Sequence, residues 1–342
     1  MPPTLPVLNR LAWALPLIWM LMLAGCVATP KAAPPAFLWG PYKDLTLTLD
    51  PRTDVFSTAA AGTIVPVTMV LSPGLTLSWA FATGECGRET LGGVDATRVA
   101  ATNVEAFNRA GIDYVVSTGG EGGVFTCSSD AAMDAFIARY ASPRLVGIDF
   151  DIEARQTPEI VDALVRRVAA TQHRYPTLRF SFTLPTQAAS DGSRAGLNAQ
   201  GRDVLDTIRR HGLTRYTINL MVMDYGPPAP ANCVVVNQAC DMGASAIQAA
   251  ENLHAAQGVP FEQIELTAMI GVNDVADNDF TLADATRVAR YARERGLAGL
   301  HFWALDRDTP CARPPQGASP TCSGIDSVPA LAYLQAFERG LR

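Results

Sequence analysis

The sequence has no Cys-x-x-Cys pair and no run of lysine or arginine, and its four histidines are scattered. A zinc site built from thiolate and imidazole ligands is therefore not indicated. The 27 basic and 33 acidic residues give a formal net charge of −6, and basic side chains are not interleaved with aromatic ones. This composition excludes the electrostatic footprint of a nucleic-acid-binding protein. Hydrophobic residues make up 48% of the 342 positions, so a sizeable core can form.

The N-terminus carries an apolar run, residues 11–23, that ends in "LAGC". The run is shorter than the roughly 20 residues that span a bilayer, and it ends in small residues, which is typical of a cleaved export signal. "LAGC" resembles a bacterial lipobox, which implies that residues 1–25 are removed and that Cys26 becomes a lipid-modified first residue. Val27 resembles the signal for outer-membrane sorting in Gram-negative cells. We expect an exported lipoprotein held at the cell envelope; a plain signal peptide cut nearby is the alternative.

Six further cysteines form an even set, as is usual in an exported chain. Short loops and neighbouring segments favour three disulfide pairs: Cys86 with Cys127, Cys233 with Cys240, and Cys311 with Cys322. Residues 26–36 include "VATPKAAPPA", whose alanine and proline content predicts an extended tether. No later stretch has the composition of a linker. We therefore expect residues 37–342 to form a single domain, and the protein to be a monomer.

Eight β-rich runs alternate with amphipathic helical stretches. The runs are "AFLWGPY", "LTLSWAF", "DYVVST", "RLVGIDFDIE", "RFSFTLP", "YTINLMVMDY", "IELTAMIG" and "LAGLHFWAL". Helices are predicted over residues 158–175 and 281–296, and the second opens with the capping pattern Thr281-x-x-Asp284. Eight such units predict an α/β fold, a (β/α)8 TIM barrel. Residues 50–74 are longer than one helix needs, and "TIVPVTMVLSPG" within them is compatible with an extra strand or an irregular helix.

Asp149, Asp151 and Glu153 occupy every second position of "GIDFDIE". Because strand side chains alternate, the three acids share one face. On an exposed face they would simply be solvated, but a strand of a closed parallel barrel is covered on both sides, so they must point into the barrel. Burial is unfavourable for carboxylates and separates their pKa values, and a carboxyl that stays protonated near neutral pH can serve as a general acid. Glu153 lies nearest the carboxyl end of the strand, where barrels carry active sites, and is the predicted acid.

Four motifs carry a family resemblance. "GIDFDIE" is similar to the DxxDxDxE signature on the fourth strand of glycoside hydrolase family 18, the chitinases and their relatives. "STGG" at residues 117–120 is similar to the family's SxGG motif, and "NLMVMDY" at residues 219–225 to its sixth-strand motif. Trp303 lies where the family keeps a tryptophan beneath the sugar. The motifs follow the family's order along nearly the whole exported domain, so the resemblance implies hydrolysis of β-1,4 linkages in chitin or chitooligosaccharides.

The resemblance also implies a retaining, substrate-assisted mechanism in which the acetamido oxygen of the substrate is the nucleophile. Glu153 would protonate the departing glycosidic oxygen as general acid and base. Asp151 would orient the acetamido group and stabilise the oxazolinium intermediate, and Asp149 would share a proton with Asp151. No cofactor or metal is implied, and the partner is a glycan that contains N-acetylglucosamine. The implied substrate-binding residues are Ser117, Gly119, Gly120, Met223, Asp224, Tyr225 and Trp303.

The sequence departs from the family pattern at two positions. Val146 replaces the first acid of DxxDxDxE, and Met223 replaces the tyrosine of the common MxYD motif. We expect the loss of the outer acid to matter less than loss of an inner one. Tyr225 lies two residues later in the sequence. Either its hydroxyl reaches the sugar from the end of the strand, or the contact that the family's tyrosine makes with the sugar is absent here. On composition alone, Trp303 is equally compatible with a packed core position.

Other functions remain open. An endo-β-N-acetylglucosaminidase would cut the core of N-linked glycans by the same mechanism. A catalytically weak oligosaccharide-binding protein is less compatible with the presence of Glu153. A metal site is disfavoured, because neighbouring same-face side chains of one strand point parallel and do not converge on an ion. The segment between the seventh and eighth predicted strands has room only for a helix and a short loop, so we expect no inserted α+β domain and a preference for soluble chitooligosaccharides over crystalline chitin.

Overall fold

The computed structural model describes Met1 and residues 36–50, 52–60, 62–153, 155–313 and 316–342. The predicted signal sequence beyond Met1, the lipidation residue Cys26 and residues 26–35 of the predicted tether lie outside the described residues. Within the described ranges, no helix is both long enough and apolar enough to cross a membrane.

Eight parallel strands form a closed barrel. Their order around the barrel is β1-β15-β14-β11-β10-β9-β7-β4, and pairing of β4 with β1 closes it. The bounds are β1 Leu38–Asp44, β4 Thr76–Glu85, β7 Asp113–Gly119, β9 Leu145–Asp151, β10 Arg179–Pro185, β11 Thr217–Met221, β14 Ile264–Met269 and β15 Gly299–Trp303. Each predicted run forms one barrel strand, so the predicted (β/α)8 fold is confirmed. The sixth strand is shorter than predicted: it ends at Met221, and Asp224 in the following loop has a left-handed φ of 46°.

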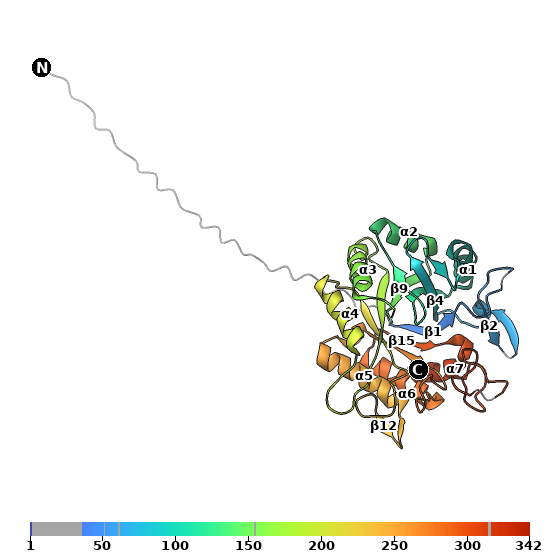
Figure 1. Ribbon diagram of the computed structural model, residues 1–342. Coiled ribbons are helices and arrows are strands. Elements are labelled where there is room, and N and C mark those ends of the chain that lie inside the picture. Colours follow the sequence, from blue (N-terminus) through green and yellow to red (C-terminus); the bar gives the residue numbers. More distant parts are fainter. Residues whose placement is uncertain (2–35, 51, 61, 154, 314–315) are drawn as a thin grey trace. The chain divides into compact units, whose positions relative to one another are not determined.

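Helices ring the strands (Figure 1). Those in the described residues are α1 Ala96–Ala110, α2 Asp130–Tyr140, α3 Pro158–Thr171, α4 Ala199–Arg210, α5 Met242–Gln257, α6 Leu282–Arg295 and α7 Ala332–Leu341. Each of α1 to α6 begins where an Asp, Ser, Thr or Asn side chain accepts a hydrogen bond from the backbone N–H three residues on, which stabilises a helix start. The capping box predicted from Thr281 and Asp284 is present. The helix predicted over residues 158–175 ends earlier, at Thr171.

The connection between β1 and β4 contains no α-helix in its described residues. β2 (Ser57–Ala60) and β3 (Thr63–Pro66) form an antiparallel hairpin, and one 3-10 turn, η1 (Val67–Met69), follows it. The segment "TIVPVTMVLSPG" therefore contains both a short strand and a helical turn, the two structures its sequence allowed. Shorter elements elsewhere are β5 Thr90–Leu91, β6 Val94–Asp95, β8 Phe125–Thr126, β12 Val235–Val236, β13 Ala239–Cys240, η2 Phe261–Gln263 and η3 Leu305–Arg307.

The three predicted disulfides are present: Cys86–Cys127, Cys233–Cys240 and Cys311–Cys322. The first joins the segments that follow β4 and β7, the second closes a loop after β11, and the third closes a loop after β15. All three therefore lie in segments that leave the carboxyl ends of barrel strands. The first disulfide links two of these segments and the other two each close a loop within one segment, so all three restrict loops at that end of the barrel.

Candidate active site

Asp149 lies inside the barrel and is 1% exposed. Four hydroxyl groups donate to its carboxylate: Ser117 Oγ at 2.6 Å, Ser181 Oγ at 2.7 Å, Thr183 Oγ1 at 2.8 Å and Tyr42 OH at 3.1 Å. The donors come from β7, β10 and β1, so the contacts reach across the barrel. Burial raises the pKa of Asp149, and the serine and threonine hydroxyls offset part of this rise because they stabilise the ionised form.

Most of these donors were not predicted, although the sequence holds a signal for them. Ser181 and Thr183 alternate with Phe180, Phe182 and Leu184 in "RFSFTLP", which is the same pattern that revealed the acids. Inside a closed barrel such alternation places polar groups in the interior. The network continues across the next strands by three hydrogen bonds: Asn219 Nδ2 to Tyr42 OH at 3.0 Å, Asn219 Nδ2 to Thr183 Oγ1 at 2.8 Å, and Thr267 Oγ1 to Asn219 Oδ1 at 2.9 Å.

Asp151 and Glu153 form a coupled pair of carboxyl groups. Burial, followed by the charges of Glu153 and Asp149, raises the pKa of Asp151 well above its ordinary value. Burial and then repulsion from Glu121 raise the pKa of Glu153 to about 7, with a smaller contribution from Asp224, while a hydrogen bond with Asp151 acts in the opposite direction. Asp151 therefore holds its proton more firmly and donates toward Glu153. Near neutral pH the pair keeps a proton available at the carboxyl end of the barrel.

The backbone around the acids is held by side chains from outside β9. Gln200 Nε2 donates to the Glu153 carbonyl oxygen at 2.7 Å, and Gln156 Nε2 donates to the Asp151 carbonyl oxygen at 2.7 Å. The Gly120 N–H also donates to the Asp151 carbonyl oxygen, at 3.3 Å. These bonds fix the chain where β9 ends, so Glu153 projects from a restrained position.

Gly119 and Gly120 are buried beside the acids in left-handed conformations, with φ of 88° and 81°. A Cβ on Gly119 would lie 2.1 Å from the Asp151 carbonyl oxygen, and one on Gly120 would lie 2.6 Å from the ring of Phe81. Larger residues would therefore force these segments apart. Ser117, which is fully buried, contacts Asp149. In this structure the "STGG" residues contact Asp149 through a side chain and Asp151 through the backbone.

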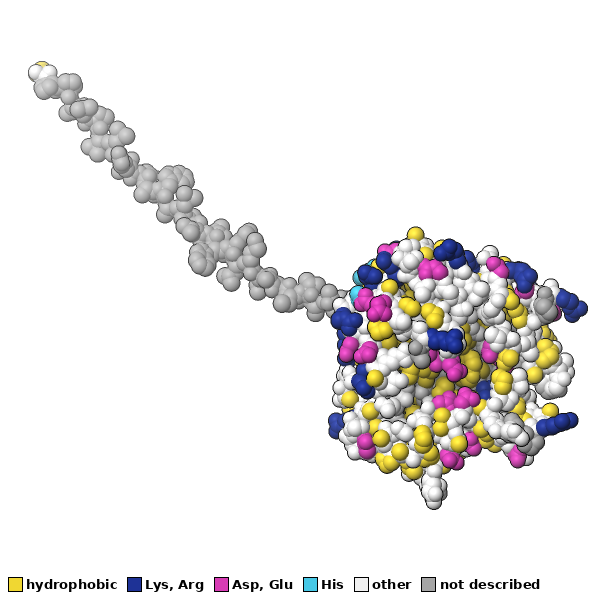
Figure 2. Space-filling model, viewed as in Figure 1, with side chains coloured by type: hydrophobic (Ala, Val, Ile, Leu, Met, Phe, Trp, Pro, Cys, Tyr) yellow, Lys and Arg dark blue, Asp and Glu magenta, His cyan; other side chains and the backbone are white. Residues whose placement is uncertain are grey.

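Trp303 is the half-buried last residue of β15, and it lies near Tyr42, which donates to Asp149. Its ring stacks on Phe81 with centroids 5.5 Å apart and planes at 16°, and it lies 6.2 Å from the Tyr42 ring. Tyr42, Ala80 and Ala304 form a small buried cluster, separate from the main core, against which Trp303 packs. On the face shown in Figure 2, acidic and hydrophobic side chains lie close together near the centre. Trp303 offers an aromatic surface at the carboxyl end of its strand, as stacking of a sugar ring requires.

The residues of the sixth-strand motif lie in different surroundings. Met223 and Asp224 are half-buried, and the Val275 N–H donates to Asp224 Oδ1 at 3.0 Å. Burial raises the pKa of Asp224, which acts on Glu153 through its charge. Tyr225 belongs to the main core and is 6% exposed; its hydroxyl has no hydrogen-bond partner among the described residues. A sugar contact through Tyr225 or Met223 stays a prediction.

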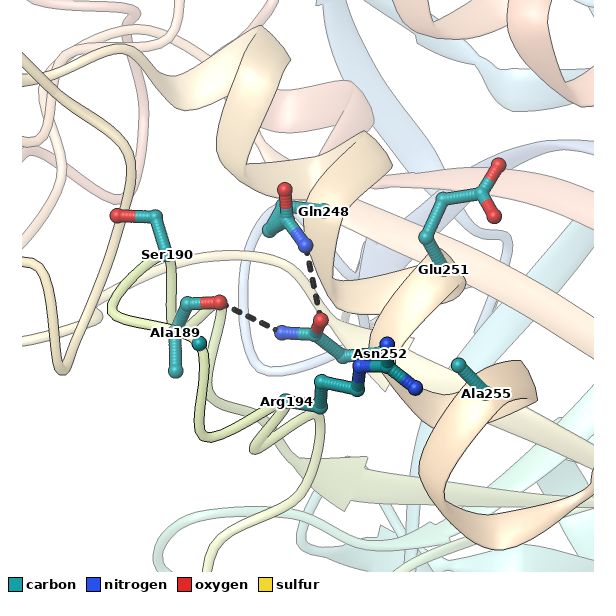
Figure 3. Close-up of a pocket in the computed structure, with 8 residues that line it drawn as sticks. Ala189, Ser190, Arg194, Gln248, Glu251, Asn252 and Ala255 are labelled. Atoms are coloured by element: carbon teal, nitrogen blue, oxygen red, sulfur yellow. Dashed lines mark hydrogen bonds between the residues drawn. The ribbon is translucent and has the colours of Figure 1, made fainter.

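A separate pocket of about 350 Å³ lies between the segment after β10 and α5 (Figure 3). Asn252 of α5 holds the segment in place: it donates to the Ala189 carbonyl oxygen at 2.8 Å and accepts from Gln248 at 2.8 Å. None of the three acids of β9 lines this pocket. Among the residues that the structure describes, no group of three or more His, Cys, Asp or Glu side chains could hold a metal ion.

Comparisons with known proteins agree with this architecture. No protein-family profile matches the chain. It is 27% identical to Endochitinase 11 of Metarhizium anisopliae over an alignment of 321 positions that covers 84% of the chain and 55% of that protein. It is 26% identical over 337 residues to a "probable bifunctional chitinase/lysozyme" of Escherichia coli, covering 91% of the chain and 35% of that protein. The chain thus spans about half or less of the length of these curated relatives.

The catalytic domain of a hyperthermophilic chitinase from Pyrococcus furiosus superposes on the chain with a TM-score of 0.68 at 24% identity, over 90% of the chain and 95% of that domain. The chain has the fold of a chitinase catalytic domain. Catalytic-site mutants of active domain 2 of a Pyrococcus furiosus chitinase, solved with chito-oligosaccharides, match this chitinase-like barrel with a TM-score of 0.66 at 24% identity. This match covers 90% of the chain and 95% of the solved one.

Proposed function

We propose that the chain is a glycoside hydrolase that cleaves β-1,4 linkages in chitin or chitooligosaccharides. The observation that carries the proposal is the series Asp149, Asp151 and Glu153, which runs along β9 toward the carboxyl end of the barrel. Its last member, Glu153, has its pKa raised to about 7. A large fraction of such a group is protonated near neutral pH, so it can act as a general acid. The names of both curated relatives support chitin as the substrate class.

In the proposed mechanism the substrate supplies the nucleophile. The acetamido oxygen attacks the anomeric carbon as the glycosidic bond breaks, and Glu153 gives its proton to the departing oxygen. Asp151 Oδ1, which is buried without a donor, accepts the acetamido N–H. The positive charge that develops on the oxazolinium ion favours the ionised form of Asp151, so the Asp151 proton passes to Asp149, whose pKa is raised by burial, and it returns to Asp151 once the ring opens. Ionised Glu153 then takes a proton from the water that opens the ring, and the configuration is retained.

The sugar that reacts would stack on Trp303, whose ring is held by Phe81. Since the nucleophile belongs to the N-acetyl group, a substrate that lacks this group at the cleaved sugar should not react. The same machinery would serve an endo-β-N-acetylglucosaminidase, so the substrate must be assigned by assay.

Fluorophore release from 4-methylumbelliferyl chitobioside and chitotrioside tests the proposal. We expect the wild type to be active and Glu153→Gln to be slower by at least about 100-fold, because general acid catalysis contributes roughly 10²–10⁴-fold. Glu294→Gln is the matched control: Glu294 is exposed on α6, and its variant should keep the wild-type rate. Oligosaccharide binding without cleavage by the wild type would indicate a binding protein instead, and cleavage restricted to N-linked glycan cores would indicate the endo-β-N-acetylglucosaminidase.

We further propose that the chain is exported and anchored to a bacterial envelope through Cys26. Support comes from the "LAGC" pattern and from the three disulfides, since disulfides persist in oxidising compartments. In a bacterial host, a palmitate analogue should label the wild-type chain, and Cys26→Ser should abolish the label and release the protein from the membrane fraction. A wild-type chain that stays unlabelled while its signal is cleaved would favour the plain signal peptide.

A further inference from the structure

Two more acids lie near Glu153, in loops that follow other barrel strands. Glu121 follows β7, which pairs with β9 and places Gly119 opposite Asp151. Asp224 follows β11. Both carboxylates repel the ionised form of Glu153, and this repulsion adds to burial in raising its pKa. Negative charge is thus concentrated around the proposed general acid.

Glu121 and Asp224 differ in their hydrogen-bond and ion-pair partners. Asp224 is half-buried and accepts a hydrogen bond from the Val275 N–H. Glu121 is exposed, and it makes no hydrogen bond or ion pair with any residue that the structure describes. Arg155 contacts the same loop: its guanidinium donates to the Gly122 carbonyl oxygen at 3.2 Å, and it forms no ion pair within the described part of the chain. Glu121 therefore has no described ion-pair partner beside the general acid.

A second observation indicates where the substrate lies. Asp151 is 5% exposed, and its buried Oδ1 has no donor among the described residues. Under the proposed function this atom receives the N–H of the N-acetylated sugar that reacts. Glu153 then contacts the glycosidic oxygen that joins this sugar to the next unit of the chain. The loop of Glu121 begins at Gly120, whose N–H donates to the Asp151 carbonyl oxygen at 3.3 Å, and Arg155 contacts the same loop at Gly122. Glu121 therefore lies at the Glu153 end of the acid series, where the proposed function places the glycosidic oxygen.

We propose that Glu121 is a specificity residue that favours a protonated glucosamine unit next to the N-acetylglucosamine unit at which the chain is cleaved. Partly deacetylated chitin would then be the preferred substrate class. The inference rests on the proposed function and deepens it. Two different requirements follow from two different acids: Asp151 demands an acetamido group in the reacting sugar, and Glu121 attracts an ammonium group in its neighbour.

The test compares kcat/KM for fully acetylated chitooligosaccharides with kcat/KM for partly deacetylated ones of equal length, in mildly acidic buffer where the amines are charged. We expect the wild type to favour the partly deacetylated substrates by roughly threefold to fivefold, as one solvent-exposed ion pair allows. Glu121→Gln should remove this preference, and so should high salt. Glu105→Gln, an exposed glutamate on α1, should keep it. Mass spectrometry of the products should place glucosamine beside the cleaved bond more often for the wild type than for Glu121→Gln.

A separate readout distinguishes this role from a structural one. General-acid activity falls as pH rises through the pKa of Glu153, and Glu121 raises that pKa. The fall in kcat/KM should therefore move to lower pH in Glu121→Gln. Equal kcat/KM for both substrates in the wild type, or a preference that survives in Glu121→Gln, would overturn the inference alone. Failure of the wild type to cleave either substrate would overturn the proposed function and this inference with it.

Discussion

At the scale of single residues, Asp149, Asp151 and Glu153 carry the same chemical group but have different neighbours. Asp149 accepts four hydroxyl donors, which stabilise its charge. Asp151 has one buried oxygen without a donor and is held near two other acids, which favours its protonated form. Glu153 is less buried and faces other acids. Along a single strand, the three carboxyl groups therefore take different proposed roles: Asp149 is a resting anion that can accept a proton, Asp151 holds a proton, and Glu153 donates one to the substrate.

The raised pKa of Glu153 has a consequence for stability. The folded-state pKa of Glu153 is about 7, above the ordinary value of 4.5. The contribution of this carboxyl to stability is therefore fully present below pH 4.5 and is lost as the pH rises through about 7. Glu153→Gln removes the titrating group. The variant should match the wild type near pH 4 and exceed it by about 3 kcal/mol near pH 8, as measured by urea unfolding.

Glu294→Gln supplies the control for this measurement, because Glu294 is exposed and should leave the pH dependence of unfolding unchanged. Equal free energies of unfolding for the wild type and Glu153→Gln at both pH values would contradict the raised pKa.

At the scale of elements, the barrel strands carry the acids and the loops carry the groups that act on them. β9 ends at Asp151, and Glu153 lies just beyond it, where Gln200 and Gln156 hold the backbone. The segments after β4, β7, β11 and β15 leave the same end of the barrel. One disulfide joins the segments after β4 and β7, and the other two close loops within the segments after β11 and β15. Loop geometry at that end is therefore restrained by covalent bonds as well as by packing.

The disulfide after β11 offers a test of this restraint. Cys233 and Cys240 close a loop that continues from Asp224, which acts on the charge of Glu153. Replacing both cysteines with serine should lower the free energy of unfolding by about 2 kcal/mol, because the short loop gains freedom mainly in the unfolded chain. The barrel should persist by circular dichroism, while KM for 4-methylumbelliferyl chitotrioside rises severalfold. An unchanged KM would mean that the loop has no part in binding substrate.

At the scale of the whole molecule, buried acids have different neighbours at the two ends of the barrel. Near the amino ends of the strands, Glu265 is paired with Arg179 at 2.8 Å and His301 at 3.0 Å. Burial alone would raise the pKa of Glu265, but Arg179 and His301 outweigh it and hold the pKa at about 2. At the carboxyl ends the acids face hydroxyl groups and one another. The buried acid at the amino end is therefore neutralised by basic partners, whereas the acids at the carboxyl end can exchange protons.

The sequence by itself determined the eight strands, the disulfide pairs and the acid series, because alternation of side chains and short cysteine spacings are local patterns. The hairpin after β1 and the end of β11 at Met221 depended on backbone conformations that these patterns do not specify. Only the tertiary structure decided that Tyr42 and Thr183 meet at Asp149, and that Glu121 and Asp224 act on Glu153. Closure of the barrel brings these distant residues together, and the burial it produces sets the pKa values on which the proposed chemistry depends.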